Sequence, residues 1–159
     1  EALALRRELL ELMTGSNTPV IAVGDLNDEI GAVSTNLVSG EAPYKNLEPD
    51  VKKLFWDVEL YSAARTHLRR SEHASFFTHI YNGHYSTIDH IFFSQEFYYR
   101  SGARIGDLSY VECLNDHITD DSIRGAPGLG AASDHGQLVA KFSFKDEVIA
   151  AAAEPADTE

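Results

Sequence analysis

The spacing of apolar residues along the chain predicts that helices alternate with strands. Leucines recur at nearly helical spacing over residues 3–13, and Gly15, a residue type common just past helix ends, follows them. Residues 19–23 (Pro-Val-Ile-Ala-Val) form a short unalternated run, which is typical of a central strand covered on both faces. A helix followed at once by a buried strand favours an α/β architecture.

The segments between the apolar runs are polar and differ in what they predict. Residues 31–49 are rich in Gly, Ser, Asn and Pro and indicate a loop. Asp50 is expected to cap a helix that runs on to Val58. Residues 115–132 are acidic and then glycine-rich, which indicates a second loop, and residues 145–159 predict a short helix fraying into a tail.

Further strands are predicted where aromatic and β-branched residues gather. An Asn-Gly pair at residues 82–83 indicates a tight turn between two of them. The last strand shows strict alternation, with Leu138, Ala140, Phe142 and Phe144 expected to point inward. The predicted strands are residues 76–80, 87–93, 108–111 and 137–144.

Composition narrows the classes of function. The chain has 159 residues, 43% hydrophobic and 24% charged, so its length and composition predict one globular domain. Lys and Arg number 13 against 25 Asp and Glu, and the net charge of −12 argues against strong non-specific binding to DNA or anionic membranes. A phosphorylated substrate remains compatible with this charge if a bound metal ion supplies local positive charge. The single cysteine, Cys113, excludes an intramolecular disulfide and a multi-cysteine zinc site.

No apolar run approaches the roughly 18 residues that a transmembrane helix requires, so no transmembrane segment is expected. The chain begins with Glu1 inside a helical pattern, and no signal peptide is visible. The sequence leaves the cellular compartment open.

Three short motifs combine acids with amide or imidazole side chains. Residues 24–27 (Gly-Asp-Leu-Asn) follow the buried strand, at the kind of sheet edge where ligands bind. Asp25 and Asn27 are two residues apart and would share one side of an extended chain. Asp25 could take a proton from water, and Asn27 could hold an oxyanion. Taken alone, a turn is the simpler interpretation of this tetrapeptide.

The second motif, Ser-Asp-His-Gly at residues 133–136, precedes the last strand. Asp134 suits a hard cation such as Mg²⁺, and His135 could donate a proton or a hydrogen bond to a phosphoryl oxygen. A solvated acid beside a surface histidine is the simpler account of this pair alone. The third motif places Asp89 inside an apolar strand, where an ionised carboxylate is costly unless it is paired or binds metal. If Asp89 meets His135, it would orient the imidazole and stabilise its protonated form.

The other histidines receive a structural or surface interpretation first. His79 and His84 come closest to a pair of zinc ligands, but they lie across a turn, which is a poor match to a zinc motif. Zinc is therefore not expected. No glycine-rich phosphate loop of the Walker type is present. The histidines expected at the surface are His67, His73 and His84. Three others could lie near a site, but a structural role is expected for each: His79, His90 and His117.

Taken in order, residues 24–27, residues 88–92 with Ser94, and residues 133–135 resemble the endonuclease/exonuclease/phosphatase superfamily, which has the deoxyribonuclease-I-like fold. The resemblance is to the C-terminal part of that domain and covers residues 1–144. It implies an α/β fold, a four-layer αββα sandwich of α+β type, to which this chain would contribute mostly one mixed β-sheet with flanking helices.

The resemblance also implies Mg²⁺- or Mn²⁺-dependent hydrolysis of phosphate esters. Asp25 would match the residue that activates the attacking water, and Asn27 its partner in orientation. Asp89 would match the acid paired with the catalytic histidine, His135, and Asp134 the acid beside it at the metal centre.

One departure from the family pattern changes the expectation for this chain. The family brings an early Asn, a metal-binding Glu and a further His or Tyr from an N-terminal half, and no such motif precedes the helix at residues 3–13. We therefore expect an incomplete metal site and little or no activity from this chain alone. We also expect an apolar sheet face that is either exposed or covered by the missing half or a partner chain.

The substrate class stays open between a nucleic acid, a nucleotide and a lipid phosphate such as a phosphoinositide or sphingomyelin. Arg65, Arg69 and Arg70 form a modest basic cluster that could follow a phosphate backbone, although a solvated face is the simpler account. Residues 97–99 (Phe-Tyr-Tyr) could stack on a base, although core packing is the simpler account. The alternative to an enzyme is a non-catalytic binding module of the same fold.

Overall fold

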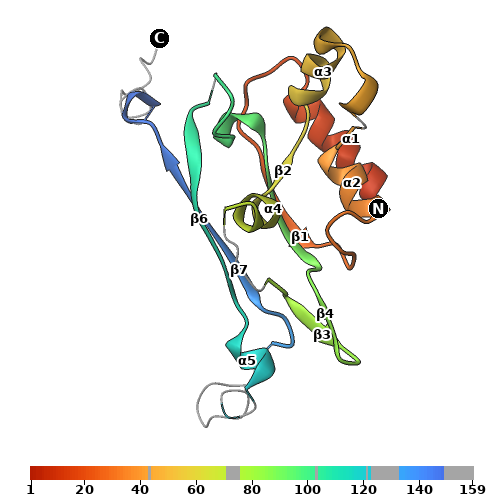
Figure 1. The fold of residues 1–159 in the computed structure, drawn as a ribbon. Helices are drawn as coiled ribbons and strands as arrows, with labels where there is room; N and C mark the ends of the chain where they lie inside the picture. The colour runs from red at the N-terminus through yellow and green to blue at the C-terminus, as the bar shows by residue number, and fades with distance from the viewer. Residues whose placement is uncertain (43, 71–75, 103, 121, 123–132, 149–159) are drawn as a thin grey trace, which may run out of the picture.

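The computed structural model describes residues 1–42, 44–70, 76–102, 104–120, 122 and 133–148, and it shows a mixed α/β chain (Figure 1). Its helices are α1 (Ala2–Met13), α2 (Val33–Ser39), α3 (Pro49–Trp56), α4 (Ala63–Leu68) and α5 (Asp116–Thr119), with short 3₁₀ helices η1 (Tyr44–Asn46) and η2 (Gln95–Phe97). Its strands are β1 (Ile21–Asp25), β2 (Tyr61–Ser62), β3 (His79–Tyr81), β4 (His84–Ser86), β5 (Asp89–Phe93), β6 (Gly106–Leu114) and β7 (Gln137–Phe144). No helix in these ranges is long and apolar enough to cross a membrane.

The described strands form three antiparallel sheets, with orders β1-β5-β2, β3-β4 and β6-β7. The expectation of mostly one mixed sheet is therefore wrong for this part of the chain. The physical reason lies in the connection into β5. β1 ends where β5 begins, and the β3-β4 hairpin lies at that same end and leads directly into β5. The chain therefore enters β5 in the antiparallel direction, whereas a parallel pair would need a crossover back to the other end.

The two faces of the β1-β5-β2 sheet carry separate apolar clusters. Because successive strand residues point to opposite faces, Phe92 of β5 packs on one side while Ile91 and Phe93 pack on the other. Figure 1 shows α1 and α2 along the first side and the long β6-β7 ribbon along the second. The first cluster is Leu9, Met13, Val20, Val38, Leu60 and Phe92. The second is Ala63, Ile91, Phe93, Phe97, Leu108 and Val111.

A buried arginine holds α1 against the next helix. Arg6 donates hydrogen bonds to the carbonyl oxygens of Val38, at 3.3 Å, and Val58, at 2.8 Å. Gly40 ends α2 in the left-handed conformation, and a Cβ at this position would lie 2.1 Å from the Arg6 guanidinium. Glycine is therefore required here both for the backbone turn and for the space that the arginine occupies.

β1 differs from the expected central strand with cover on both faces. It lies at the edge of its sheet, and among the described strands it pairs only with β5. Val23 is 70% exposed and Ile21 is 44% exposed. The expectation of an exposed apolar sheet face is thus confirmed at these two residues. The prediction of full cover was wrong because the β6-β7 ribbon covers β5 and leaves this face of β1 open.

Two local predictions between β1 and β2 also need correction. Residues 33–39 form α2 where a loop was expected, and polar side chains of this helix hydrogen-bond to the backbone of the turn that precedes it. The Thr35 hydroxyl donates to the Glu29 carbonyl oxygen at 2.8 Å, and the Asn36 amide donates to the Gly31 carbonyl oxygen at 2.9 Å. α3 begins at Pro49, which needs no N–H donor at a first helical position, and so Asp50 is not the cap.

Other predicted elements are confirmed. α1 ends just before Gly15, and Asn82 and Gly83 both have positive φ, as a two-residue hairpin turn requires. This turn joins β3 to β4, whereas the predicted strand at residues 87–93 pairs with β1 as β5. Phe144 is 46% exposed, so Phe142 is the last inward-pointing residue of β7, one inward position before the expected end. The expected loop at residues 115–132 begins with α5, and residues 123–132, most of the tail and His73 lie outside the described residues.

Candidate functional site

Two carboxylates face each other where β1 ends and β5 begins. Asp25 is the last residue of β1 and Asp89 is the first of β5, and the two are direct partners in the antiparallel register. Like charges placed opposite each other on one sheet face destabilise a pair of strands. A cation or a protonated base at this position would remove that cost, so the arrangement favours a positively charged partner.

His135 supplies one such partner from a distant part of the chain. Its Nδ1 lies 2.9 Å from the Asp89 Oδ2, although the two residues are 46 positions apart. Because a carboxylate only accepts, the imidazole Nδ1–H donates this hydrogen bond. Among the described residues the opposite ring nitrogen, Nε2, has no hydrogen-bond partner, so it is left for a ligand.

Thr78 ties the segments of this site together. It is fully buried, and its hydroxyl oxygen accepts hydrogen bonds from the backbone N–H groups of Ile88 and Asp89, both at 3.1 Å. Its carbonyl oxygen accepts from the N–H of Gly136, next to His135, at 2.6 Å. Thr78 is thus bonded both to the backbone of Asp89 and to that of Gly136, the residue after His135, and this helps to set the distance between the Asp89 and His135 side chains.

The charges around His135 favour its protonated form. Its pKa is raised above the ordinary 6.5, first by the hydrogen bond to Asp89, while burial acts in the opposite direction. The charges of Asp25 and Asp134 raise it further. The side chain is a little over a quarter exposed, so solvent weakens these effects without removing them. The site therefore shifts His135 towards the form in which both ring nitrogens carry hydrogen and can donate hydrogen bonds.

Two overlapping groups of side chains bring potential metal ligands within 4.8 Å of one another: Asp25, Asp89 and His135, and His79, Asp134 and His135. Two carboxylates fit Mg²⁺, which takes oxygen ligands and usually one or two carboxylates, whereas imidazole nitrogens fit Mn²⁺ or other transition metals better. The donor set therefore fits a divalent cation without selecting Mg²⁺. Four of the five residues proposed from the sequence lie in these groups.

His79 is the residue of this site that the sequence reasoning missed. It was expected to be structural, yet its backbone forms an isolated antiparallel bridge with His135, and the two rings lie 4.9 Å apart. Its position two residues after an aromatic pair gave no local signal of metal binding. Only the pairing of residues from two distant segments shows that the side chains meet.

Asn27 contacts Asp25 through its backbone. It adopts a left-handed conformation, with φ of 52°, and its backbone N–H donates to the Asp25 Oδ1 at 2.7 Å. The expectation that Asp25 and Asn27 project from one side of an extended strand is wrong, because β1 ends at Asp25 and the chain turns. Asn tolerates this backbone conformation better than most residues, and the Asp side chain caps the turn.

Other histidines have separate roles. His117 Nε2 lies 2.9 Å from the carbonyl oxygen of His135, to which it donates, so it supports the backbone that carries the His135 ring. His90 points to the opposite face of β5 from Asp89 and is buried. Comparison with protein-family models, with curated proteins and with solved structures finds no match for the chain.

Proposed function

We propose that the chain carries the acid–histidine centre of a metal-dependent phosphoesterase with the endonuclease/exonuclease/phosphatase fold. The observation that carries this proposal is the Asp89–His135 pair, at 2.9 Å, with Asp25 directly opposite Asp89. These residues come from three segments, so no local turn or cap explains their meeting. The layers also support part of an αββα sandwich, because helices cover one face of the β1-β5-β2 sheet and the β6-β7 ribbon covers β5 on the other.

In this proposal water attacks phosphorus in line with the ester bond. A new P–O bond forms to the water oxygen as the P–O bond to the leaving alcohol breaks. Asp25 accepts the proton that the attacking water loses, and the leaving alkoxide takes a proton from solvent. Asp25 is exposed and one of its oxygens, Oδ2, makes no hydrogen bond to the described residues, which suits it to receive a water molecule.

His135 stabilises the phosphoryl group rather than attacking it. Asp89 holds the ring through Nδ1 and favours the imidazolium, so that Nε2–H can donate to a phosphoryl oxygen that gains charge in the transition state. Asp89 acts through the histidine and is a positioning residue. Asp134 and His79 would hold a divalent cation that supplies charge neutralisation to the phosphate, while His135 keeps both ring nitrogens for hydrogen bonds.

Hydrolysis of a generic phosphodiester, bis(p-nitrophenyl) phosphate, and a monoester, p-nitrophenyl phosphate, tests the proposal. We expect slow turnover that needs Mg²⁺ or Mn²⁺, is lost in chelator and is lost in Asp25→Asn. Asp50→Asn, an exposed acid on α3, is the matched control and should hydrolyse as the wild type does. Turnover that survives in Asp25→Asn or in chelator would contradict the assignment.

Metal binding gives a second readout that does not depend on the rate of hydrolysis. Binding of Mn²⁺ to the chain, followed by electron paramagnetic resonance, should weaken in Asp134→Asn and in His79→Gln and stay unchanged in Asp50→Asn. A binding module of the same fold would show neither metal binding nor turnover. A chain that neither binds Mn²⁺ nor hydrolyses either ester therefore counts against the enzyme.

A further inference from the structure

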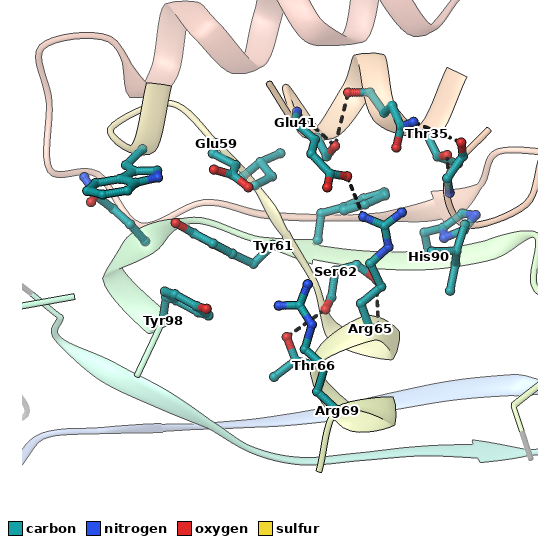
Figure 2. Close-up of a pocket in the computed structure, with 18 of the residues that line it drawn as sticks. Thr35, Glu41, Glu59, Tyr61, Ser62, Arg65, Thr66, Arg69, His90 and Tyr98 are labelled. Atoms are coloured by element: carbon teal, nitrogen blue, oxygen red, sulfur yellow. Dashed lines mark hydrogen bonds and ion pairs between the residues drawn. The ribbon is translucent and has the colours of Figure 1, made fainter. Parts of the chain in front are cut away.

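A second site is suggested by a cavity of about 500 Å³ that shares no residue with the acid–histidine centre. It lies beside β2, between α2, α4 and the segment around η2, and is open to solvent (Figure 2). Its volume falls within the roughly 300–1,000 Å³ of small-molecule sites. We call it the β2 cavity, and its lining includes Glu41, Trp56, Tyr61, Arg65, Arg69 and His90.

The β2 cavity is lined by more arginines than acids, although the chain as a whole has a net charge of −12. Three arginines, Arg65, Arg69 and Arg100, line it together with two acids, Glu41 and Glu59. Arg65 is held in place by an ion pair with Glu41. The Arg69 guanidinium makes no hydrogen bond or ion pair with the described residues, so it is available to an anion. Arginine matches the geometry of phosphate and carboxylate oxygens.

Aromatic rings occupy one end of the β2 cavity. Tyr61 and Tyr98 are stacked at 3.9 Å with an interplanar angle of 6°. Trp56, at the end of α3, also lines the cavity and is 43% exposed. Exposed aromatic faces bind planar rings by stacking. From the sequence, a solvated face was the simpler interpretation of the basic cluster, and core packing that of the aromatic stretch. In the structure, they contribute Arg65, Arg69 and Tyr98 to one cavity.

At the other end lies a buried polar atom without a partner. His90 is 2% exposed, and its Nε2 lies 2.8 Å from the carbonyl oxygen of Asp28. Because a carbonyl only accepts, Nε2 carries the hydrogen, and in the neutral ring Nδ1 is then an acceptor. Nδ1 has no hydrogen-bond partner among the described residues. A buried polar atom left unpaired is costly, so the cavity favours a ligand that donates a hydrogen bond there.

We propose that the β2 cavity binds a nucleoside monophosphate. Figure 2 shows His90 and Tyr98 at opposite ends, with the Arg65 and Arg69 side chains between them in this view. The base stacks at the Tyr98 and Trp56 end, the phosphate contacts Arg69, and a hydroxyl of the ligand donates to Nδ1 of His90. Such a ligand satisfies all three features, whereas a free phosphate or a free nucleoside satisfies only part of them. The site is independent of the proposed hydrolysis.

Trp56 is the only tryptophan of the chain, so its fluorescence reports directly on the β2 cavity. We would titrate the 159-residue chain with AMP, UMP, adenosine and inorganic phosphate, in chelator so that no hydrolysis occurs, and repeat the titrations by calorimetry. We expect AMP to bind at least about tenfold more tightly than adenosine or phosphate, because each of these lacks one group of contacts. Failure of both monophosphates to bind at millimolar concentration would overturn the proposal.

Matched variants locate the binding. Arg69→Gln should weaken AMP binding about tenfold or more, whereas Arg7→Gln, an exposed arginine of α1 outside the cavity, should not. His90→Gln can keep the hydrogen bond to Asp28 through its amide nitrogen while it removes the Nδ1 acceptor, and it should also weaken binding. Wild-type affinity in both cavity variants would overturn the proposal. Loss of AMP binding in Asp25→Asn would do so too, since it would place AMP at the acid–histidine centre.

Discussion

Asp89 and His90 are neighbours in β5, yet they belong to two different regions of the molecule. Asp89 lies on the sheet face where it meets His135 and Asp25, partly open to solvent and surrounded by charge. His90 lies on the opposite face, buried, with one nitrogen bonded to a backbone carbonyl and the other facing no partner among the described residues. The alternation of a strand therefore sends one residue to an acidic cluster and the next to the arginine-lined cavity.

The same residue type acquires different chemistry from the surroundings of these two regions. His135 is placed among three acids and favours its protonated form. His90 shares a cavity with arginines and is held by a carbonyl as a hydrogen-bond donor at one nitrogen only. In the two proposals, His135 donates to a ligand through Nε2, and His90 accepts from a ligand through Nδ1. Both depend on β5 keeping its register with β1.

The largest expected effect separates the two regions by activity. Asp89→Asn should lower the rate of metal-dependent ester hydrolysis by about 10²–10⁴-fold, because the imidazolium of His135 loses its anionic partner. AMP binding in the β2 cavity should remain, as measured by Trp56 fluorescence. Equal hydrolysis rates for Asp89→Asn and the wild type would show that the pair is structural only.

Phe93 supports β5, the strand that both regions share, so removal of its ring should destabilise the fold on which both depend. Phe93 is fully buried and contacts the Tyr61 and Phe142 rings, so Phe93→Ala should reduce the free energy of unfolding by about 3–5 kcal/mol. Val23→Ala on the exposed face of β1 should change it by no more than about 0.5 kcal/mol. Urea unfolding of the two variants tests the contrast. A large cost at Val23 would mean that this face is covered in solution.

The charge of the Asp89–His135 pair should appear in the pH dependence. The pKa of His135 in the folded chain lies above 6.5, its ordinary value, so the stability it adds is fully present below pH 6.5 and is lost as pH rises through the raised pKa. The stability difference between the wild type and Asp89→Asn should therefore be full below pH 6.5 and shrink as the pH rises through the raised pKa. A nuclear magnetic resonance titration of the imidazole should show a lower pKa in Asp89→Asn, and an unchanged value would contradict the pairing.

The smallest effect concerns Cys113, which lies near the acid–histidine centre. Burial raises the pKa of its thiol to about 11, and the charge of Asp89 adds to this. Alkylation at mildly alkaline pH should be slow in the folded chain, because only the thiolate reacts. Asp89→Asn should accelerate it about two- to threefold. Rates equal to that of a free thiol would show that the half-buried position of Cys113 does not hold in solution.

Local features were accessible from the sequence because nearby residues decide them. The helix before Gly15 follows from apolar spacing, and the turn at Asn82 and Gly83 follows from the backbone freedom of these two residue types. The candidate acids were recognisable because a short acid after a buried strand, or within one, is unusual. The helix at residues 33–39 was not, because its polar residues favour a loop until their side chains find backbone partners.

By itself, the sequence determined the first helix, the turn at Asn82 and Gly83, the net charge, and Asp25, Asn27, Asp89, Asp134 and His135 as the candidate residues. Only the tertiary structure decided that the three acids and His135 meet, that His79 joins them, and that β1 is an open edge. It alone placed His90 and Arg69 in one cavity. The physical reason is that local propensity acts over a few residues, whereas strand register and packing set contacts between segments tens of residues apart.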